Sequence, residues 1–185
     1  YDAEINKKSH QKDSLYEKIQ DCLPDGWELT ETDAWLQMQS LGEQFAEQGW
    51  KGHVSAVWYE AESIAERVMT VLIGQNCSFK IVKNISILKM INDCHYPMSG
   101  ANKFITFYPE TEEKFVEVME ELYRELAEFQ GPRIYTDMQC QQCSCLHYRY
   151  GAFVIMVQYD RDDEKLKYYM RDSEGTLVED TRKPW

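Results

Sequence analysis

The stretch Gln48-Gly49-Trp50-Lys51-Gly52-His53-Val54-Ser55-Ala56-Val57 decides how the rest of the chain is interpreted. A Gly-Trp pair ends the preceding loop, and the alternation that follows is typical of a β-strand. Because side chains alternate between the two faces of a strand, we expect polar groups on one face and small apolar groups on the other. The polar set is Lys51, His53 and Ser55, and the apolar set is Gly52, Val54 and Ala56. An edge strand with a solvated polar face would show the same alternation, so this segment alone leaves both interpretations open.

Length and composition indicate one folded domain. The chain has 185 residues, enough for a substantial core, with 43% hydrophobic and 13% aromatic residues. No apolar run approaches the roughly 20 residues of a membrane-spanning helix, and no signal-peptide pattern opens the chain, so we expect a cytoplasmic protein. The first residue is Tyr1 rather than Met, and we interpret residues 1–185 as one domain of a longer polypeptide.

Charge and cysteine content exclude several classes of function. The net charge is −12, from 20 basic and 32 acidic residues, so we expect neither nucleic acid nor a membrane as a partner. Six cysteines without a secretory signal favour a reduced, intracellular chain. The pattern Cys140-x-x-Cys143-x-Cys145, with His147 nearby, resembles a zinc site, but ligands at alternate positions of one strand fit poorly around one ion. We therefore predict no metal site and no cofactor.

The order of predicted elements favours an α+β fold with a mostly antiparallel sheet and flanking helices. One helix is expected within residues 1–22, and three more are expected over 61–73, after a cap at Asn84 and from Thr111 onward. A hairpin is expected around Asp33, and strands are expected at 78–82, 103–108, 134–135, 146–150, 152–159 and 167–171.

Basic side chains in predicted strands stand out in a chain this acidic. They are Lys51, Lys80, Lys103 and Arg149, each in a different strand and close to apolar or aromatic residues. A cation rooted in a core-forming strand is costly unless an anion or a polar pocket receives it. Any one of them could instead extend its charged head into water. The four together with His53 indicate a site for an anion.

Four separate motifs resemble the N-terminal lyase domain of class III and class IV lanthionine synthetases. They are Gly49 to Ala56, Phe79-Lys80, Lys103 to Pro109 and Tyr148 to Phe153, and Asp25-Gly26-Trp27 and Gly175 to Arg182 match in order and spacing. The resemblance covers essentially the whole chain. That domain is itself similar to the phosphothreonine lyases that some pathogenic bacteria inject into host cells, which share the Lys-x-His pair.

The resemblance implies a phosphoserine/phosphothreonine lyase that needs no metal. Its substrate would be a precursor peptide phosphorylated by a kinase domain of the same polypeptide, which a cyclase-like domain would follow. Position by position, Lys80 matches the general base and His53 the general acid. The residues that match the phosphate-binding positions are Lys51, Lys103 and Arg149.

Elimination chemistry is consistent with these residue types. A neutral lysine can take a Cα proton where burial and nearby cations lower its pKa, and the same cations can hold the departing phosphate. Histidine can give a proton to the leaving oxygen, because imidazole titrates near neutral pH. A phosphopeptide-binding or leader-peptide-binding module without elimination activity is the alternative interpretation, and such a module has no use for Lys80 together with His53.

Overall fold

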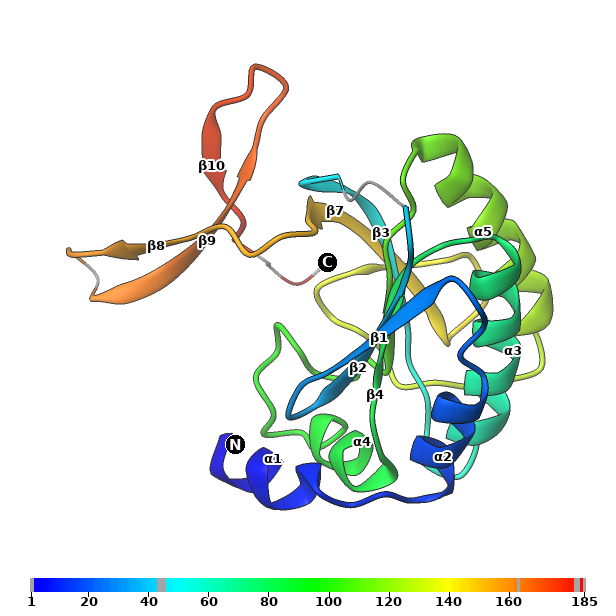
Figure 1. The fold of residues 1–185 in the computed structure, drawn as a ribbon. Coiled ribbons are helices and arrows are strands. Elements are labelled where there is room, and N and C mark those ends of the chain that lie inside the picture. Colours follow the sequence, from blue (N-terminus) through cyan, green and yellow to red (C-terminus); the bar gives the residue numbers. More distant parts are fainter. Residues whose placement is uncertain (1, 43–45, 163, 182–183, 185) are drawn as a thin grey trace.

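The structure, a computed structural model, describes residues 2–42, 46–162, 164–181 and 184. Within these ranges the chain forms a seven-stranded sheet, a smaller three-stranded sheet and five helices (Figure 1). The order in the large sheet is β1-β2-β4-β5-β3-β7-β6, and all neighbouring strands are antiparallel. The predicted α+β fold with a mostly antiparallel sheet is confirmed.

The elements have the following bounds. The helices are α1 (Asp2–Ser9), α2 (Ser14–Asp21), α3 (Ala61–Gly74), α4 (Ile85–Ile91) and α5 (Glu112–Glu125). The strands of the large sheet are β1 (Trp27–Glu31), β2 (Trp35–Ser40), β3 (Gln48–Val54), β4 (Phe79–Val82), β5 (Ile105–Phe107), β6 (Met138–Gln139) and β7 (Leu146–Ala152). The strands of the small sheet are β8 (Val157–Asp160), β9 (Lys165–Arg171) and β10 (Leu177–Glu179).

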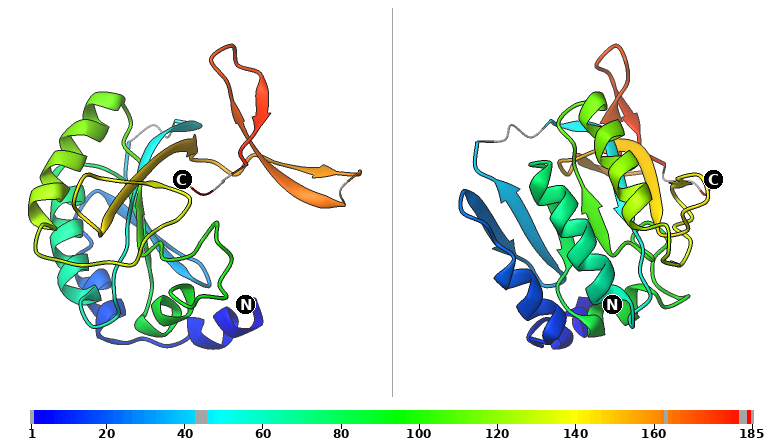
Figure 2. Two further views of the ribbon diagram at one scale, coloured as in Figure 1. Left: turned by 180° about the vertical axis from the view of Figure 1, so that it is seen from behind. Right: turned by 90° about the vertical axis from the view of Figure 1, so that its right-hand side faces the viewer.

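Helices α3 and α5 cover one face of the large sheet (Figures 1 and 2). The side chains that this face contributes to the core are fully buried; they include Val54, Phe79, Ile81, Ile105, Phe107 and Leu146. No helix in the described part of the chain has both the length and the apolar character that crossing a membrane requires.

Strand β3 lies inside the sheet, between β5 and β7, so the edge-strand interpretation is wrong. Its position depends on a glycine: a Cβ at Gly52 would lie 1.9 Å from Cζ of Phe107. The aromatic ring of β5 therefore occupies the space that any other residue at position 52 would fill. Gly52 of β3 and Phe107 of β5 are cross-strand partners, so this close packing holds the two strands together on the sheet face opposite the polar side chains of β3.

Helix starts follow the capping residues in the sequence. The Asn84 side chain accepts a hydrogen bond from the backbone N–H of Ile87, and α4 begins there as predicted. One helix within residues 1–22 was expected, but there are two. Asp13 has extended backbone and accepts a hydrogen bond from the N–H of Tyr16, so it starts a second helix, α2.

The last third of the chain departs most from prediction. Ile134 and Tyr135 form no strand, and the strand expected at 152–159 is divided, because β7 ends at Ala152 and β8 begins at Val157. Strand β10 was not predicted. We call β8, β9 and β10 the C-terminal arm, which projects away from the body formed by the large sheet and the helices (Figure 2).

Candidate active site

Strand register places four of the predicted site residues on the sheet face opposite the helices. Lys51 pairs with Arg149 across β3 and β7, and His53 pairs with Thr106 across β3 and β5. Lys80 pairs with the same Thr106 from β4. Because cross-strand partners point to the same face, these side chains share one surface. His53 and Lys80 are two strand spacings apart, about 10 Å between Cα atoms.

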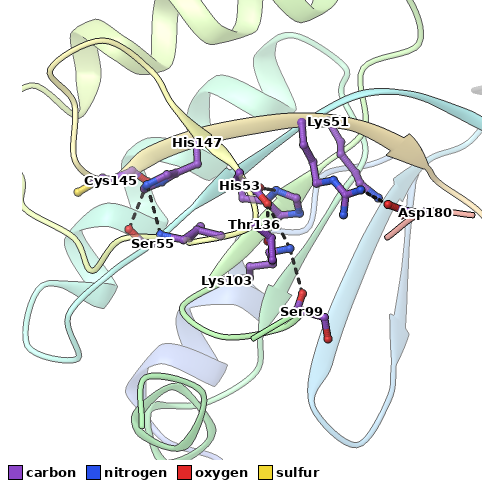
Figure 3. A network of polar contacts seen from close by, with 12 residues as sticks. Lys51, His53, Ser55, Ser99, Lys103, Thr136, Cys145, His147 and Asp180 are labelled. Carbon is purple, nitrogen blue, oxygen red and sulfur yellow. Dashed lines mark hydrogen bonds and ion pairs between the residues drawn. The ribbon is translucent and has the colours of Figure 1, made fainter. Parts of the chain in front are cut away.

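Lys103 joins this surface through Asp137, which the sequence interpretation missed. Figure 3 shows Lys103 next to Thr136 and Ser99. Lys103 Nζ lies 3.4 Å from Oδ1 of Asp137 and donates a hydrogen bond to the Ser99 carbonyl oxygen at 3.0 Å. The other carboxylate oxygen of Asp137 contacts Nδ1 of His53. The Thr136 hydroxyl donates to Oδ1 of Asp137 at 2.7 Å. A buried carboxylate thus holds the predicted acid and one predicted phosphate ligand together.

Burial determines the charges in this group. Burial, opposed by Asp137 and reinforced by Lys103 and Lys51, lowers the pKa of His53 to about 3. Burial alone would raise the pKa of Asp137, but His53 and Lys103 hold it below its ordinary value. In the absence of substrate, His53 is therefore neutral and Asp137 ionised at pH 7. The expectation that His53 titrates near neutral pH does not hold for the substrate-free chain.

Lys51 and Arg149 form a second cluster, next to Gly151. A Cβ at Gly151 would lie 3.5 Å from Cε of Lys51 and 3.4 Å from Nη2 of Arg149. Both side chains therefore lie close to the backbone of Gly151, which has no side chain of its own. Lys51 Nζ donates to the Ala152 carbonyl oxygen at 2.6 Å. Arg149 Nη2 forms an ion pair with Asp180, which directly follows β10. The residue that directly follows the arm thereby contacts the predicted phosphate-binding arginine.

Three of the four cations that were predicted to lie in strands are not surface side chains with solvated heads. Lys51 and Arg149 are each 8% exposed and Lys103 is 7% exposed, so that alternative is wrong for these three residues. Lys80 is half-buried, and its Nζ lies 4.5 Å from the centre of the Trp35 ring. An indole face attracts an ammonium group, and this contact limits where the Lys80 side chain points.

A pocket of about 120 Å³ contains two of these lysines. Its lining includes Lys51, Lys80, Tyr108, Phe153, Tyr168 and Tyr169. Burial raises the pKa of Tyr108 above its ordinary value, so its phenol group stays protonated. The pocket places the predicted base beside a predicted phosphate ligand and beneath the start of the arm.

His147 supports the loop that carries Asp137. It pairs with His53 across β3 and β7, and its Nε2 accepts a hydrogen bond from the Ile134 N–H at 3.3 Å. The N–H of Asp137 in turn donates to the Ile134 carbonyl oxygen at 3.2 Å. Burial lowers the pKa of His147 to about 4, which keeps the ring neutral and Nε2 able to accept.

The possible zinc ligands are not gathered into a metal-binding group. Within the described residues, three potential ligand atoms lie within 4.8 Å of one another only in the exposed turn Asp93-Cys94-His95. Cys143 and Cys145 are instead buried as free thiols in the core.

The fold is one that phosphothreonine lyases also have. The structure of SpvC, a phosphothreonine lyase effector protein from Salmonella, gives a TM-score of 0.55 at 17% identity, covering 77% of this chain and 78% of that chain. The type III effector and phosphothreonine lyase OspF from Shigella flexneri gives 0.53 at 15% identity, with 77% and 78% covered. At such low identities the similarity establishes a common fold.

Sequence comparison identifies the family to which the chain belongs. Residues 15–185 match the family described as RamC, N-terminal domain, and the chain belongs to this family. A curated relative from Streptomyces coelicolor, described as a probable SapB synthase, is 34% identical over 171 residues, which is 92% of this chain. The chain spans only 18% of the length of that relative. These findings confirm the predicted family relationship.

Proposed function

We propose that the chain is a phosphoserine/phosphothreonine lyase that eliminates phosphate from a phosphorylated precursor peptide during lanthipeptide biosynthesis. The products would be dehydroalanine and dehydrobutyrine. The observation that carries this proposal is that Lys80, His53, Lys51 and Arg149 share one sheet face, and that the buried Lys103 is connected to His53 through Asp137. The phosphothreonine lyase fold and membership of the RamC N-terminal domain family support it.

Lys80 is the proposed base. Its neutral amine takes the Cα proton of the phosphorylated residue, the electrons of that C–H bond form the Cα–Cβ double bond, and phosphate leaves with the electrons of the Cβ–O bond. Lys80 and Lys51 line the same pocket, so the proposed base and a phosphate ligand face the same space. The spacing of about 10 Å between His53 and Lys80 leaves room for the substrate between them.

Lys51, Lys103 and Arg149 are the proposed phosphate ligands. Charge-assisted hydrogen bonds from buried cations hold a dianion strongly, and they stabilise the phosphate as it leaves. Lys103 and Arg149 each already contact a carboxylate, Asp137 and Asp180 respectively. Phosphate would share these cations with the carboxylates, which keep the cationic side chains in place while the site is empty.

His53, the proposed general acid, must gain a proton before it can give one, because its pKa without substrate is about 3. A phosphate dianion beside the ring favours the imidazolium form, and ionised Asp137 on the Nδ1 side favours it too. In this scheme His53 takes up a proton as the phosphopeptide binds and donates it to the leaving oxygen. The acid is thus charged only when its substrate is present.

A longer polypeptide would supply and consume the reactants. We propose that residues 1–185 are its lyase domain, that a kinase domain phosphorylates the precursor peptide, and that a cyclase-like domain uses the dehydro product. The relative, of which the chain spans 18%, is long enough to hold such domains. The reaction would take place in the cytoplasm and would require neither metal nor nucleotide.

Mass spectrometry of a synthetic phosphoserine peptide incubated with the chain tests the proposal. Elimination removes phosphoric acid and leaves a product about 98 Da lighter, whereas a phosphopeptide-binding or leader-peptide-binding module leaves the mass unchanged. The unphosphorylated peptide is the control. We expect undiminished turnover in a chelator, and a requirement for added divalent ions would contradict a reaction without metal.

A further inference from the structure

The C-terminal arm has an apolar face that is exposed. Val157 pairs with Tyr168 and Tyr159 pairs with Leu166, so these four side chains lie on one face of the arm. Their exposures range from 38% to 64%. More than half of the large apolar side chains exposed in the described part of the chain lie between residues 150 and 177. An apolar surface of this kind marks an interaction site.

The apolar face continues into the candidate active site. Tyr168 lines the pocket of about 120 Å³ that contains Lys51 and Lys80. Met170, two residues along the same face of β9, lines a second pocket of about 410 Å³ together with Arg149. The face therefore adjoins both the proposed base and the proposed phosphate ligands.

The base of the arm is fixed against β3. The Phe153 ring packs 5.3 Å from the Tyr108 ring, between centres, and a Cβ at Gly49 would lie 2.8 Å from the Phe153 ring. The Gln48 side chain donates to the Arg171 carbonyl oxygen at 2.8 Å and accepts from the Arg171 N–H at 2.7 Å. Strand β3 therefore holds the arm beside the site at two points, through Phe153, which follows β7, and through Arg171 of β9.

We propose that the apolar face of the arm binds apolar side chains that flank the phosphorylated residue of the substrate peptide. This rests on the proposed function, since it places the phosphate on the proposed phosphate ligands and the neighbouring residues on Val157 and Tyr168 of the arm and on Ile155, which precedes β8. Ile155 lines the same pocket and is 83% exposed, available for such a contact. The net charge of −12 disfavours acidic flanks. The substrate class is a phosphoserine or phosphothreonine peptide with aliphatic or aromatic neighbours.

A matched pair of phosphoserine peptides tests this subsite. The two peptides differ only in the residues beside phosphoserine, which are leucine in one and serine in the other. We expect kcat/KM to be about tenfold higher for the leucine peptide. Val157→Ser should lower this ratio toward one, with the rate on the serine peptide unchanged. Tyr168→Ser should lower the ratio as well, and because Tyr168 lines the pocket with Lys51 and Lys80, the ratio rather than the absolute rate is its readout.

Leu177→Ser is the matched control. Leu177 is 38% exposed, as Val157 is, but it pairs with Arg171 on the opposite face of the arm. This variant should keep the tenfold preference. A preference lost equally in all three variants would show that the arm has merely been destabilised, and it would overturn the assignment to one face.

The remaining outcomes separate this inference from the proposed function. Equal kcat/KM for both peptides, with elimination observed, would overturn the subsite and leave the lyase proposal standing. If neither peptide is eliminated, the lyase proposal fails, and the ratio of the two Kd values, measured by fluorescence anisotropy, decides the subsite. A concentration-dependent dimer that Val157→Ser abolishes in analytical ultracentrifugation would assign the face to a second copy and overturn the inference.

Discussion

The two faces of the large sheet are made from alternate residues of the same strands. On one face Val54, Phe107 and Ile81 are fully buried against the helices. On the other, their neighbours His53, Thr106 and Lys80 form a polar surface with buried cations. Because successive side chains of a strand point to opposite faces of the sheet, one short segment can supply residues both to the core and to the candidate site.

The two faces should respond differently to substitution. Removing an apolar contact weakens the folded state, because packing and burial are lost while the reacting groups keep their positions. Removing the proposed base or a proposed phosphate ligand should weaken catalysis, because these groups would interact with the charge of the substrate. Measuring both stability and elimination rate for each variant tests this separation.

Lys80→Arg should give the largest effect. A guanidinium keeps the positive charge but stays protonated at any accessible pH, so it cannot accept the Cα proton. We expect elimination to fall at least about a thousandfold by mass spectrometry, with an unchanged thermal unfolding midpoint.

Lys89→Arg is a matched control for this variant, because Lys89 Nζ lies 4.0 Å from the centre of the Trp58 ring, much as Lys80 lies over Trp35. The control should keep its rate. Near-normal elimination by Lys80→Arg would show that Lys80 binds rather than abstracts, and Lys51 or His53 would then become the candidate base.

Gly52→Ala should give the next largest effect, on stability. The new Cβ would meet Phe107 at 1.9 Å, so strands β3 and β5 must separate or the ring must move. We expect a loss of about 3 kcal/mol in the free energy of unfolding, measured in urea, with the rate per folded molecule reduced far less. Adding Phe107→Leu should restore part of the stability. An unchanged unfolding midpoint would contradict the close approach of these strands.

Much of the sheet could be predicted, because its signals are local. Alternation in β3, the Asn84 and Thr111 caps and the strand cations all belong to short segments of sequence. The division of residues 1–22 was missed because Asp13 was not recognised as a cap. The split between β7 and β8 was missed because residues 152–157 form an unbroken apolar run, and nothing local indicates where the chain leaves the large sheet.

The partners of the site residues could not be predicted. Asp137 and Asp180 are two of many acidic residues in the chain, and only the folded structure brings them to His53 and Arg149. Burial of a cation is also not specific to the site. Lys83 is 3% exposed and bonds Glu31 at 2.6 Å without belonging to the group of proposed catalytic residues. The resemblance to a known family is what distinguishes the lysines of the proposed site from a buried lysine such as Lys83.

Arg149→Ala and Lys51→Ala should have an intermediate effect, on affinity. Each removes one charge-assisted contact to phosphate, and we expect a loss of about 1.5–3 kcal/mol in phosphopeptide binding by calorimetry. The affinity for the unphosphorylated peptide should not change. Equal losses for both peptides would mean that these side chains support the fold.

Arg149→Ala also removes the ion pair between Arg149 and the buried Asp180 carboxylate, so Asp180→Asn combined with Arg149→Ala is the matched control. The double variant should regain stability while phosphopeptide binding stays weak.

His147→Gln should give the smallest effect, and it refines the comparison because His147 lies on the polar face but is assigned a supporting role. The pKa of His147 is about 4 in the folded chain against an ordinary value of 6.5. Below pH 6.5 the unfolded chain therefore binds a proton at His147 that the folded chain does not bind. The stability that neutral His147 contributes is complete above pH 6.5 and is lost as pH falls toward 4. Between pH 6.5 and 5.5 the loss is about 1 kcal/mol.

Glutamine can still accept the Ile134 N–H but does not titrate, so urea unfolding of the His147→Gln variant should depend less on pH over this range, with elimination at pH 7 nearly unchanged. The same pH dependence in both proteins would assign acid destabilisation to His53, which is also buried and neutral, and would leave His147 without a measurable part in it.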